Sequence, residues 1–570
     1  MSLEADVLIV GGGSAGCVLA ARLSEDAGCR VILIEAGRDV SSSDVPADIA
    51  SGYPGRAFLN PAYKWADLRA RLGMSRANAA EARLPRLYEQ AKVLGGGSCI
   101  NAMVANRGAP DDYNEWHDLG ATGWGWHDVL PYFRKLETDC DLDGGFHGQS
   151  GPIHIRRHRD EKISPFVKQV RSALVKRGHS LHNDQNGVWE DGVFAVTVAC
   201  AADGGRQPTS LAYLTDDVRK RPNLRIVTGV EVTRILFDGL RAIGVEVRTP
   251  GGTMAIRASQ TIVCCGGVHS PALLMRSGIG PAAHLRDIGV EVVADSVDVG
   301  QNLMEHPSLS LSTYLAPQDR VTDDSTHQAQ ACLRLSSGLE AAGVGDLHFQ
   351  ILAKSAWHAI GRRLGTLFFW INKPYSRGEV RLRSADPAAR PDVDFRLLSD
   401  RRDLERMKQC VRVAASVLDD LYRERVTGEP FPAVFSDRIK KVSAVNAYNA
   451  ARLAAFGMLL DLVGETMRAA LIRTVVTEGL ALRDLLADDD ALEAFVLKST
   501  GGTWHPTGTC RMGAIDDIKA VTDASGRVRG VMGLRVCDGS LMPSIPRANT
   551  NIPIIMMAER IADLVKAEAK

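Results

Sequence analysis

The sequence has no excess of either charge and no long hydrophobic run. Its 570 residues contain 68 Lys and Arg against 68 Asp and Glu, without a polybasic run. This balance creates no field that would draw the protein to nucleic acid or an anionic membrane, and it favours a small neutral or zwitterionic partner. Because no stretch of about 18 apolar residues runs uninterrupted, no transmembrane segment is expected.

The cysteine pattern also excludes some classes of site. The eleven cysteines are odd in number, and they lack CxxC spacing and any metal-ligand rhythm. We therefore expect free thiols in a reducing compartment and no bound metal. The first residues lack the basic region, apolar region and cleavage site of a secretory signal. A cytoplasmic protein is the expectation.

The first forty residues predict a nucleotide-binding unit. A β-branched run at 6–10 leads into GGGSAG at 11–16, then a helix-like stretch at 17–23, and a buried strand at 31–34 that ends at Glu35. A strand, glycine turn, helix and second strand with an acid at its end form the dinucleotide-binding fingerprint. The fingerprint alone does not distinguish FAD from NAD.

Each glycine that the fingerprint needs has a physical reason. Gly11 allows the tight turn, Gly13 lets the backbone approach a pyrophosphate, and Gly16 lets helix and strand pack closely. The helix N-terminus then meets the phosphate charge. Glu35 favours a free ribose hydroxyl over a 2′-phosphate.

Later segments resemble one family. Residues 88–101 (YEQAKVLGGGSCIN) and 266–280 (GGVHSPALLMRSGIG) are further glycine-rich loops. With the first fingerprint they resemble the signatures of the glucose–methanol–choline (GMC) oxidoreductases, which use FAD. The resemblance continues in the family order through VGQNLMEHP at 299–307, WHPTGT at 504–509, DGSLMP at 538–543 and NTNIP at 549–553. Within the family the chain is most similar to the bacterial 5-hydroxymethylfurfural oxidase and aryl-alcohol oxidase branch, particularly at 101–108 and 369–374.

The resemblance implies an α/β fold with two interleaved domains. A Rossmann-like FAD-binding domain would take residues 1–155, 205–310 and 495–570. A substrate-binding domain of antiparallel sheet plus helices would take 156–204 and 311–494, with a helical segment at about 403–498. From the residues themselves, 224–228 and 243–247 alternate like strands around a hairpin signal at Asp238 and Gly239.

The stretch 447–476 is longer than expected for this branch. Charged residues interrupt its apolar ones, so it predicts an amphipathic helix rather than a membrane span. We expect it to pack on the core or to form a dimer face, with a cap over the substrate as the alternative. A homodimer is therefore one expectation for the assembly.

The resemblance also implies the residues that contact FAD. Val232 would place its backbone against the adenine, Asp538 would hold the ribityl or phosphate region, and the backbone around Asn551 would face the pyrimidine side of the ring. The implied cofactor-binding set is Gly11, Gly13, Ser14, Ala15, Gly16, Glu35, Ala36, Leu94, Gly97, Asn101, Ala102, Met103, Val104, Val232, Asp538, Gly539, Asn549, Thr550 and Asn551. Some relatives tether FAD through a histidine where this chain has Ile100, so non-covalent FAD is expected.

Two residues of the family motifs are the expected catalytic pair. His505 would accept the hydroxyl proton, since an imidazole has its ordinary pKa near working pH. Asn549 would hydrogen-bond the substrate oxygen and stabilise the developing negative charge. Isolated histidines are usually packed or exposed without a catalytic role, and we interpret His306 and His147 as structural despite their recurrent motifs. The same interpretation covers His117, His127, His284, His327 and His358.

Four residues are expected to line the substrate pocket. Trp504 and Trp370 would wall an aromatic pocket, with Met103 and Ile371 near them. For Trp370, plain core packing is an equal alternative.

The expected reaction is the oxidation of a primary, aromatic or heteroaromatic alcohol to an aldehyde by hydride transfer to FAD. Oxygen would accept the electrons and give hydrogen peroxide. Three alternatives stay open: a choline dehydrogenase-like enzyme that uses a quinone or another acceptor, a non-redox FAD-containing lyase, and an FAD-binding module without activity. An NADPH-dependent monooxygenase ranks last, because the 266–267 segment lacks the spacing of a second dinucleotide fingerprint.

Overall fold

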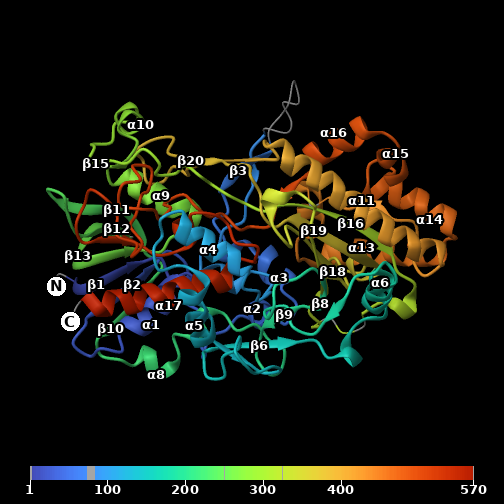
Figure 1. Cartoon of the computed structure of the whole chain (residues 1–570), viewed down its shortest axis with the longest axis horizontal. Helices are drawn as coiled ribbons and strands as arrows, with labels where there is room; N and C mark the ends of the chain where they lie inside the picture. Colours follow the sequence, from blue (N-terminus) through green and yellow to red (C-terminus); the bar gives the residue numbers. More distant parts are fainter. Residues whose placement is uncertain are drawn as a thin grey trace.

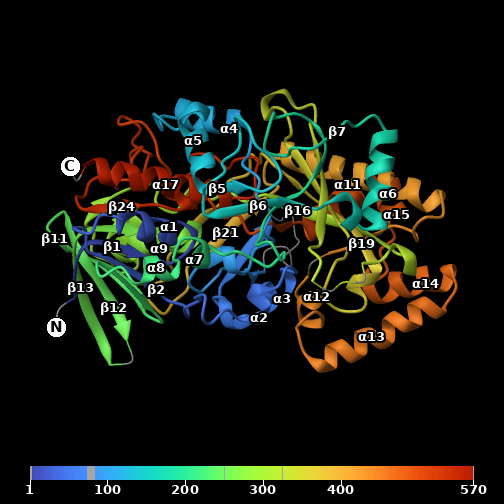
Figure 2. The same ribbon diagram turned by 90° about the horizontal axis from the view of Figure 1, so that it is seen from below.

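Two large sheets lie side by side in the computed structural model, which describes residues 3–73, 84–249, 251–321, 323, 325–434 and 436–568. In Figure 1 the first sheet lies at the left, where both chain ends are found, and the second at the right. Helices cover both (Figures 1 and 2). The expected α/β class with parallel and antiparallel sheets is confirmed.

The first sheet contains a parallel core, and its strands are β10 (Leu224–Thr228), β2 (Val31–Glu35), β1 (Leu3–Val10), β13 (Gly252–Val263) and β24 (Leu534–Val536). All five residues of β2 are buried. Parallel strands covered on both faces are continuously apolar, which is why β1 and β2 could be predicted from the sequence.

A hairpin extends this sheet. β11 (Glu231–Asp238) and β12 (Arg241–Thr249) pair in antiparallel fashion up to Asp238 and Arg241. The turn runs through Gly239, which has φ +54°, so the predicted hairpin signal is confirmed. The predicted strand at 224–228 exists as β10, but it joins β2 in parallel and takes no part in the hairpin.

Two helices from opposite ends of the chain close this half of the molecule. α1 (Ser14–Leu23) and α17 (Asn551–Glu568) lie side by side in both views (Figures 1 and 2). The Arg22 guanidinium donates to both carboxylate oxygens of the buried Glu559, at 2.8–3.0 Å. A bidentate ion pair of this kind fixes the relative orientation of the two helices. The first helix of the nucleotide turn is therefore held by the last helix of the chain.

The second sheet is mostly antiparallel. Its strands run in the order β22 (Phe431–Pro432), β16 (Pro307–Tyr314), β19 (Leu364–Ile371), β18 (Leu347–Leu352), β17 (Ala329–Leu335), β8 (Gly192–Ala195) and β7 (Leu181–His182), and β23 (Gly501–Gly502) also pairs with β16. β23 brings the segment just before His505 to the start of β16. The boundaries of the two expected domains stay a prediction.

Helices dominate residues 401–499. These helices are α11 (Arg401–Arg423), α12 (Asp437–Val442), α13 (Ala447–Leu462), α14 (Glu465–Leu471), a π-helix (Ile472–Val476), α15 (Leu482–Ala487) and α16 (Asp489–Ser499). α13 contributes Leu453 and Phe456 to the wall of the central cavity. Its outer side exposes Tyr448 at 73% and Leu462 at 84%. α13 therefore lines a cavity on one side and presents an apolar side to solvent.

Two further expectations concern membrane spans and thiols. Among the described residues, no helix combines the length and apolar character needed to cross a bilayer. All eleven cysteines are free thiols, as expected.

Candidate active site

A cavity of about 980 Å³ lies between the two sheets. Its wall comes from the turn after β1, the loop at 96–104, the cavity-facing side of the second sheet, and segments 503–506, 538–539 and 549–551. Residues from nearly the whole length of the chain therefore meet around one space. The volume suits a large cofactor together with a small substrate.

The turn after β1 is built as the glycines predict. Gly11 has φ +101°, and a Cβ there would lie 2.5 Å from the Cys264 carbonyl oxygen. A Cβ on Gly16 would lie 2.0 Å from the Gly11 carbonyl oxygen. Gly16 does not line the cavity, so its part is to let helix and strand pack closely. Gly11, Gly13, Ser14 and Ala15 do line it.

Three glycines face open space in this wall. A Cβ on Gly97 or Gly266 would meet nothing within 4 Å, and one on Gly13 would meet only the Cys264 carbonyl oxygen at 3.9 Å. All three line the cavity. Bare backbone facing a cavity lets peptide N–H groups approach a phosphate or ring closely. The wall therefore fits the FAD that the sequence predicts.

Glu35 lies where the strand–turn–helix unit places a ribose-binding acid. Its carboxylate accepts hydrogen bonds from the amides of Gly12 at 2.8 Å and Gly37 at 2.7 Å. Burial raises the pKa of Glu35 to about 7. Glu35, Ala36 and Val232 all line the cavity. Leu94 does not; it is buried beside Gly12, where an added Cβ would lie 2.5 Å from its side chain.

The C-terminal segments join this turn through side chains. Asp538 accepts from the Gly266 amide at 2.8 Å and the Ser270 hydroxyl at 2.5 Å, and burial raises its pKa. The Ser14 hydroxyl donates to Asn551 Oδ1 at 2.6 Å. The other predicted cofactor residues that line the cavity are Asn101, Ala102, Met103, Val104, Gly539, Asn549 and Thr550.

His505 and Asn549, the predicted catalytic pair, are brought together. Asn549 Nδ2 lies 3.3 Å from His505 Nε2, and the backbone N–H of Asn549 donates to Asn106 Oδ1 at 2.8 Å. His505 is 8% exposed. Burial holds the pKa of His505 well below the ordinary 6.5. The imidazole of His505 is therefore neutral at working pH and free to accept a proton.

A buried carboxylate and a hydroxyl hold the other side of this imidazole. Glu305 accepts from the amides of His306, Thr503 and His505 and from the hydroxyls of Tyr88 and Thr503. Burial raises the pKa of Glu305. Three of these donors are backbone N–H groups, which can only donate, and they favour the ionised carboxylate.

This network sets the tautomer of His505. Thr503 donates to Glu305 Oε1 at 2.9 Å, so its oxygen accepts from His505 Nδ1 at 2.8 Å. Nδ1 therefore carries the proton, and Nε2 presents its lone pair beside Asn549. His306 Nδ1 lies 2.9 Å from His505 Nδ1 and accepts as well. Burial lowers the pKa of His306 to about 3, so that ring is neutral too.

The sequence missed these supporting residues. His306 was interpreted as structural, yet it contacts the imidazole of His505 directly. Glu305 and Thr503 are 198 positions apart in the chain, so no local pattern connects them. The only signals were an acid beside His306 and a threonine two positions before His505.

Three of the four predicted pocket residues line the cavity. Trp504 has φ +63°, and its ring nitrogen donates to Glu89 Oε2 at 2.9 Å. Met103 has φ +57°, and Trp370 bonds through its ring nitrogen to Asn372 at 2.9 Å. Ile371 differs from the expectation. It points from the opposite face of β19 into the main core, because neighbouring residues of a strand face opposite sides.

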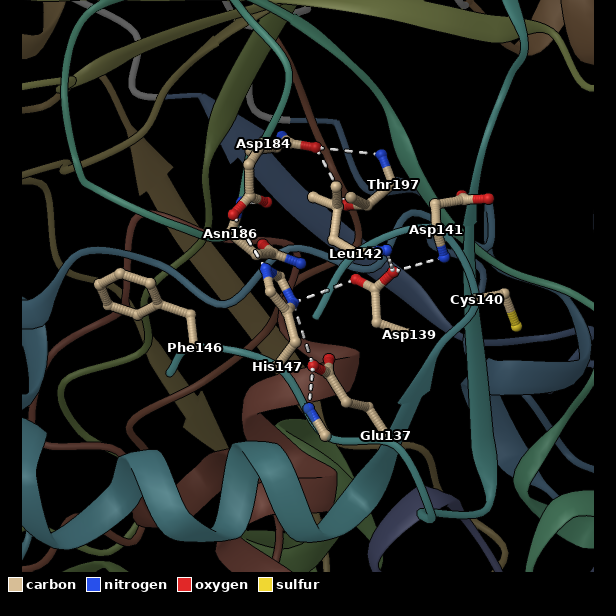
Figure 3. Close-up of polar contacts among 12 residues, drawn as sticks. Glu137, Asp139, Cys140, Asp141, Leu142, Phe146, His147, Asp184, Asn186 and Thr197 are labelled. Carbon is tan, nitrogen blue, oxygen red and sulfur yellow. Dashed lines mark hydrogen bonds and ion pairs between the residues drawn. The ribbon is translucent and has the colours of Figure 1, made fainter. Parts of the chain in front are cut away.

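Figure 3 shows a buried ionic cluster around His147. Its residues are not part of the cavity wall. His147 Nε2 lies 2.9 Å from Asp184, and Nδ1 lies 3.1 Å from Asp139. Arg107 pairs with Glu137, and Arg157 pairs with Asp139 at 2.8 Å.

Glu137, Asp139 and His147 could in principle hold a metal ion. Burial lowers the pKa of His147, but the hydrogen bonds that its ring nitrogens donate to Asp139, Asp184 and Glu137 outweigh that effect and raise it to about 10. Two guanidinium groups and one imidazolium then balance the three carboxylates. The charges of the cluster therefore balance as an ion network, in keeping with the structural interpretation of His147.

Comparison with known proteins extends the resemblance over the whole chain. Models of the GMC oxidoreductase N- and C-terminal regions match residues 5–308 and 374–558. The chain is 39% identical to a 5-(hydroxymethyl)furfural oxidase of a Methylovorus species, over 99% of both chains. It is 32% identical to an oxygen-dependent choline dehydrogenase of Brucella anthropi, over 98% of this chain and 95% of the relative.

A solved structure has the same architecture. The crystal structure of pyridoxine 4-oxidase from Mesorbium loti superposes with a TM-score of 0.76 at 27% identity, covering 99% of each chain. The family models match most of the chain, and a relative above 30% identity covers nearly all of it. The chain therefore belongs to the GMC oxidoreductase family, whose members are FAD-dependent enzymes that act on CH–OH groups.

Proposed function

We propose that this enzyme oxidises a primary aromatic or heteroaromatic alcohol to the aldehyde, with oxygen as the electron acceptor and hydrogen peroxide as the second product. The observation that carries the proposal is the unprotonated Nε2 of His505 beside Asn549 in the wall of the cavity. Relatives named as a furfural oxidase and a pyridoxine oxidase support the substrate class. Aromatic walls from Trp370, Phe368 and Trp504 suit a flat ring.

FAD would be held against the cavity wall that contains Gly13, Gly97 and Gly266. The amides around Gly13 and the start of α1 would bind its phosphates, Glu35 would bind a ribose, and Gly97 and Gly266 would leave room for its bulk. When bound, FAD supplies the hydride acceptor for the alcohol carbon. The residues that contact it, and the two-domain division that positions them, are part of this proposal.

His505 is the base in this reaction. Its Nε2 receives the proton of the alcohol hydroxyl, while Nδ1 continues to donate to Thr503 and His306. The carboxylate of Glu305 stabilises the resulting imidazolium through the Thr503 hydroxyl. Asn549 Nδ2, now beside Nε2, is placed to donate to the substrate oxygen and to orient it.

FAD attachment is non-covalent in this proposal. Ile100 cannot form the bond that a histidine makes in some relatives. Cys264 and Cys265 line the cavity, but burial raises the pKa of both thiols and keeps them protonated and unreactive. Acid precipitation should therefore release the yellow colour into the supernatant, and colour retained in the pellet would contradict non-covalent binding.

The acceptor is tested by product stoichiometry. Oxidation of an aryl alcohol under air should give one hydrogen peroxide per aldehyde. Aldehyde formed only after addition of a quinone or a dye would instead identify a dehydrogenase. A non-redox lyase is separated by anaerobic mixing, because only an oxidoreductase has its flavin bleached by an alcohol. The free thiols support a cytoplasmic location within the proposal.

A further inference from the structure

We propose that Gln350 is a second recognition point in the cavity and binds a hydrogen-bond acceptor carried across the ring from the reacting alcohol. The inference rests on the proposed function, because it identifies the class of alcohol that the site prefers. The favoured substrates are one-ring primary alcohols with a formyl, ester or carboxyl group opposite the carbinol.

One face of the second sheet forms the floor of the substrate side. In register across β16, β19 and β18, Ser310 pairs with Phe368 and Phe368 with Gln350, and Ser312 pairs with Thr366 and Thr366 with Leu352. All six residues line the cavity. The residues between them on the same strands lie in the hydrophobic core: Leu309, Leu311, Leu367, Phe369, Phe349 and Ile351. The alternation of a strand thus separates a core face from a recognition face.

On this floor, Gln350 has a side-chain donor that makes no hydrogen bond within the part of the chain that the structure describes. It is 4% exposed, and its buried Nε2 has no hydrogen-bond partner among the described residues. The hydroxyls beside it are already committed: Ser310 donates to the Ala433 carbonyl at 2.6 Å, and Ser312 and Thr366 bond each other at 2.6 Å. A buried donor left without a partner costs about 1–3 kcal/mol, so a ligand that supplies an acceptor gains from meeting it.

The spacing from the catalytic pair fits one ring. His306, which contacts His505, directly precedes β16. β18, which carries Gln350, is two strands away across β19. Two strand spacings amount to about 10 Å, and Ser310, which is in register with Gln350 through Phe368, lies about 13 Å beyond His306 along β16. The backbones of His306 and Gln350 are therefore about 16 Å apart, a distance that the side chains at either end and one ring with substituents at opposite positions span. Phe368 and Leu352 supply the apolar surface for the ring between these points.

The experiment compares two alcohols of matched size. 4-(Hydroxymethyl)benzaldehyde carries the acceptor opposite the carbinol, and 4-methylbenzyl alcohol carries a methyl group there. The ratio of their kcat/KM values is measured for the parent holoenzyme, for Gln350→Met, and for Ser310→Ala as a control on the same floor. Taking the ratio within each enzyme removes the electronic difference between the two alcohols.

In Gln350→Met the ratio should fall roughly 5–10-fold, which corresponds to the free energy of one hydrogen bond. The fall should come from a lower kcat/KM for 4-(hydroxymethyl)benzaldehyde, while kcat/KM for 4-methylbenzyl alcohol stays unchanged. In Ser310→Ala it should stay at the parent value. An unchanged ratio in Gln350→Met, or equal falls in both variants, would overturn the inference. If Gln350→Met loses its FAD, Gln350→Leu takes its place, because an apolar side chain of similar size also cannot donate and should lower the same ratio. Failure of the parent to oxidise either alcohol would instead remove the proposed function itself.

Discussion

The Thr503 hydroxyl lies 2.8 Å from Nδ1 of His505 and donates to Glu305. Its single proton goes to the carboxylate, so its oxygen must accept from the imidazole. That direction leaves Nε2 of His505 without a proton before any substrate arrives, as the proposed role of this nitrogen as the base requires. The hydroxyl of Thr503 thereby determines which nitrogen of His505 carries the proton.

Thr503→Val should slow flavin reduction by an alcohol about 10-fold or more, because a hydrogen bond to a developing imidazolium is lost. Thr503→Ser restores the hydroxyl and should stay close to the parent rate. Anaerobic stopped-flow mixing measures both at saturating alcohol. Equal loss in the valine and serine variants would show that packing, not the hydroxyl, matters at this position.

The rate of flavin reduction should be independent of pH above about pH 6.5. Burial lowers the pKa of His505 well below its ordinary value, so the base is neutral throughout that range. The rate should fall only at lower pH, where His505 becomes protonated. A rate that rises through pH 7 to 8 would mean that another group controls the reaction.

Gly97→Val should abolish FAD binding while the protein stays folded. The added side chain enters the space that a Cβ at Gly97 now faces, where no atom lies within 4 Å. Gly145 is a matched control, since a Cβ there also meets nothing, but it is an exposed loop residue outside the cavity. The ratio of flavin to protein absorbance should be near zero for Gly97→Val and normal for Gly145→Val.

The His147 cluster should make stability decrease with rising pH. The pKa of His147 is raised to about 10 in the folded protein. A raised pKa contributes stability that is complete below the unfolded value of about 6.5 and is lost as pH rises through the folded value. The melting temperature of the parent should therefore fall toward pH 10.

His147→Gln removes the titrating group and should flatten that dependence. It should also lower the melting temperature at pH 7, because the carboxylates of Asp139 and Asp184 lose a buried cation. Parallel melting curves for parent and variant between pH 6.5 and 10 would contradict the assignment of a charged His147.

Local signals predicted the nucleotide half of the molecule well. The strand of residues 31–35 is fully buried, and its apolar run ends at Glu35. One short segment therefore predicted both the strand and the acid at its end. The pairing of β3 (Arg69–Gly73) with β21 (Asp392–Leu397) has no such signal, because the strands are separated by more than half of the chain.

The substrate side of the cavity was harder to predict, because it also depends on long-range strand pairing. Trp370 and Ile371 were predicted together from one motif, but a strand sends neighbours to opposite faces, and only Trp370 reaches the cavity. Gln350 belongs to no motif, and its place on the floor depends on the register of β18 with β19. Long-range register is set by packing of the whole sheet, which a single strand does not reveal.

The account depends most on His505, and His505→Ala tests it directly. The variant should bind FAD normally and show alcohol-driven flavin reduction lowered by roughly 10²–10⁴-fold, the usual contribution of a general base. Anaerobic stopped-flow spectroscopy of the yellow holoenzyme with an aryl alcohol provides the rate. Reduction at a near-parent rate in His505→Ala would contradict the central claim.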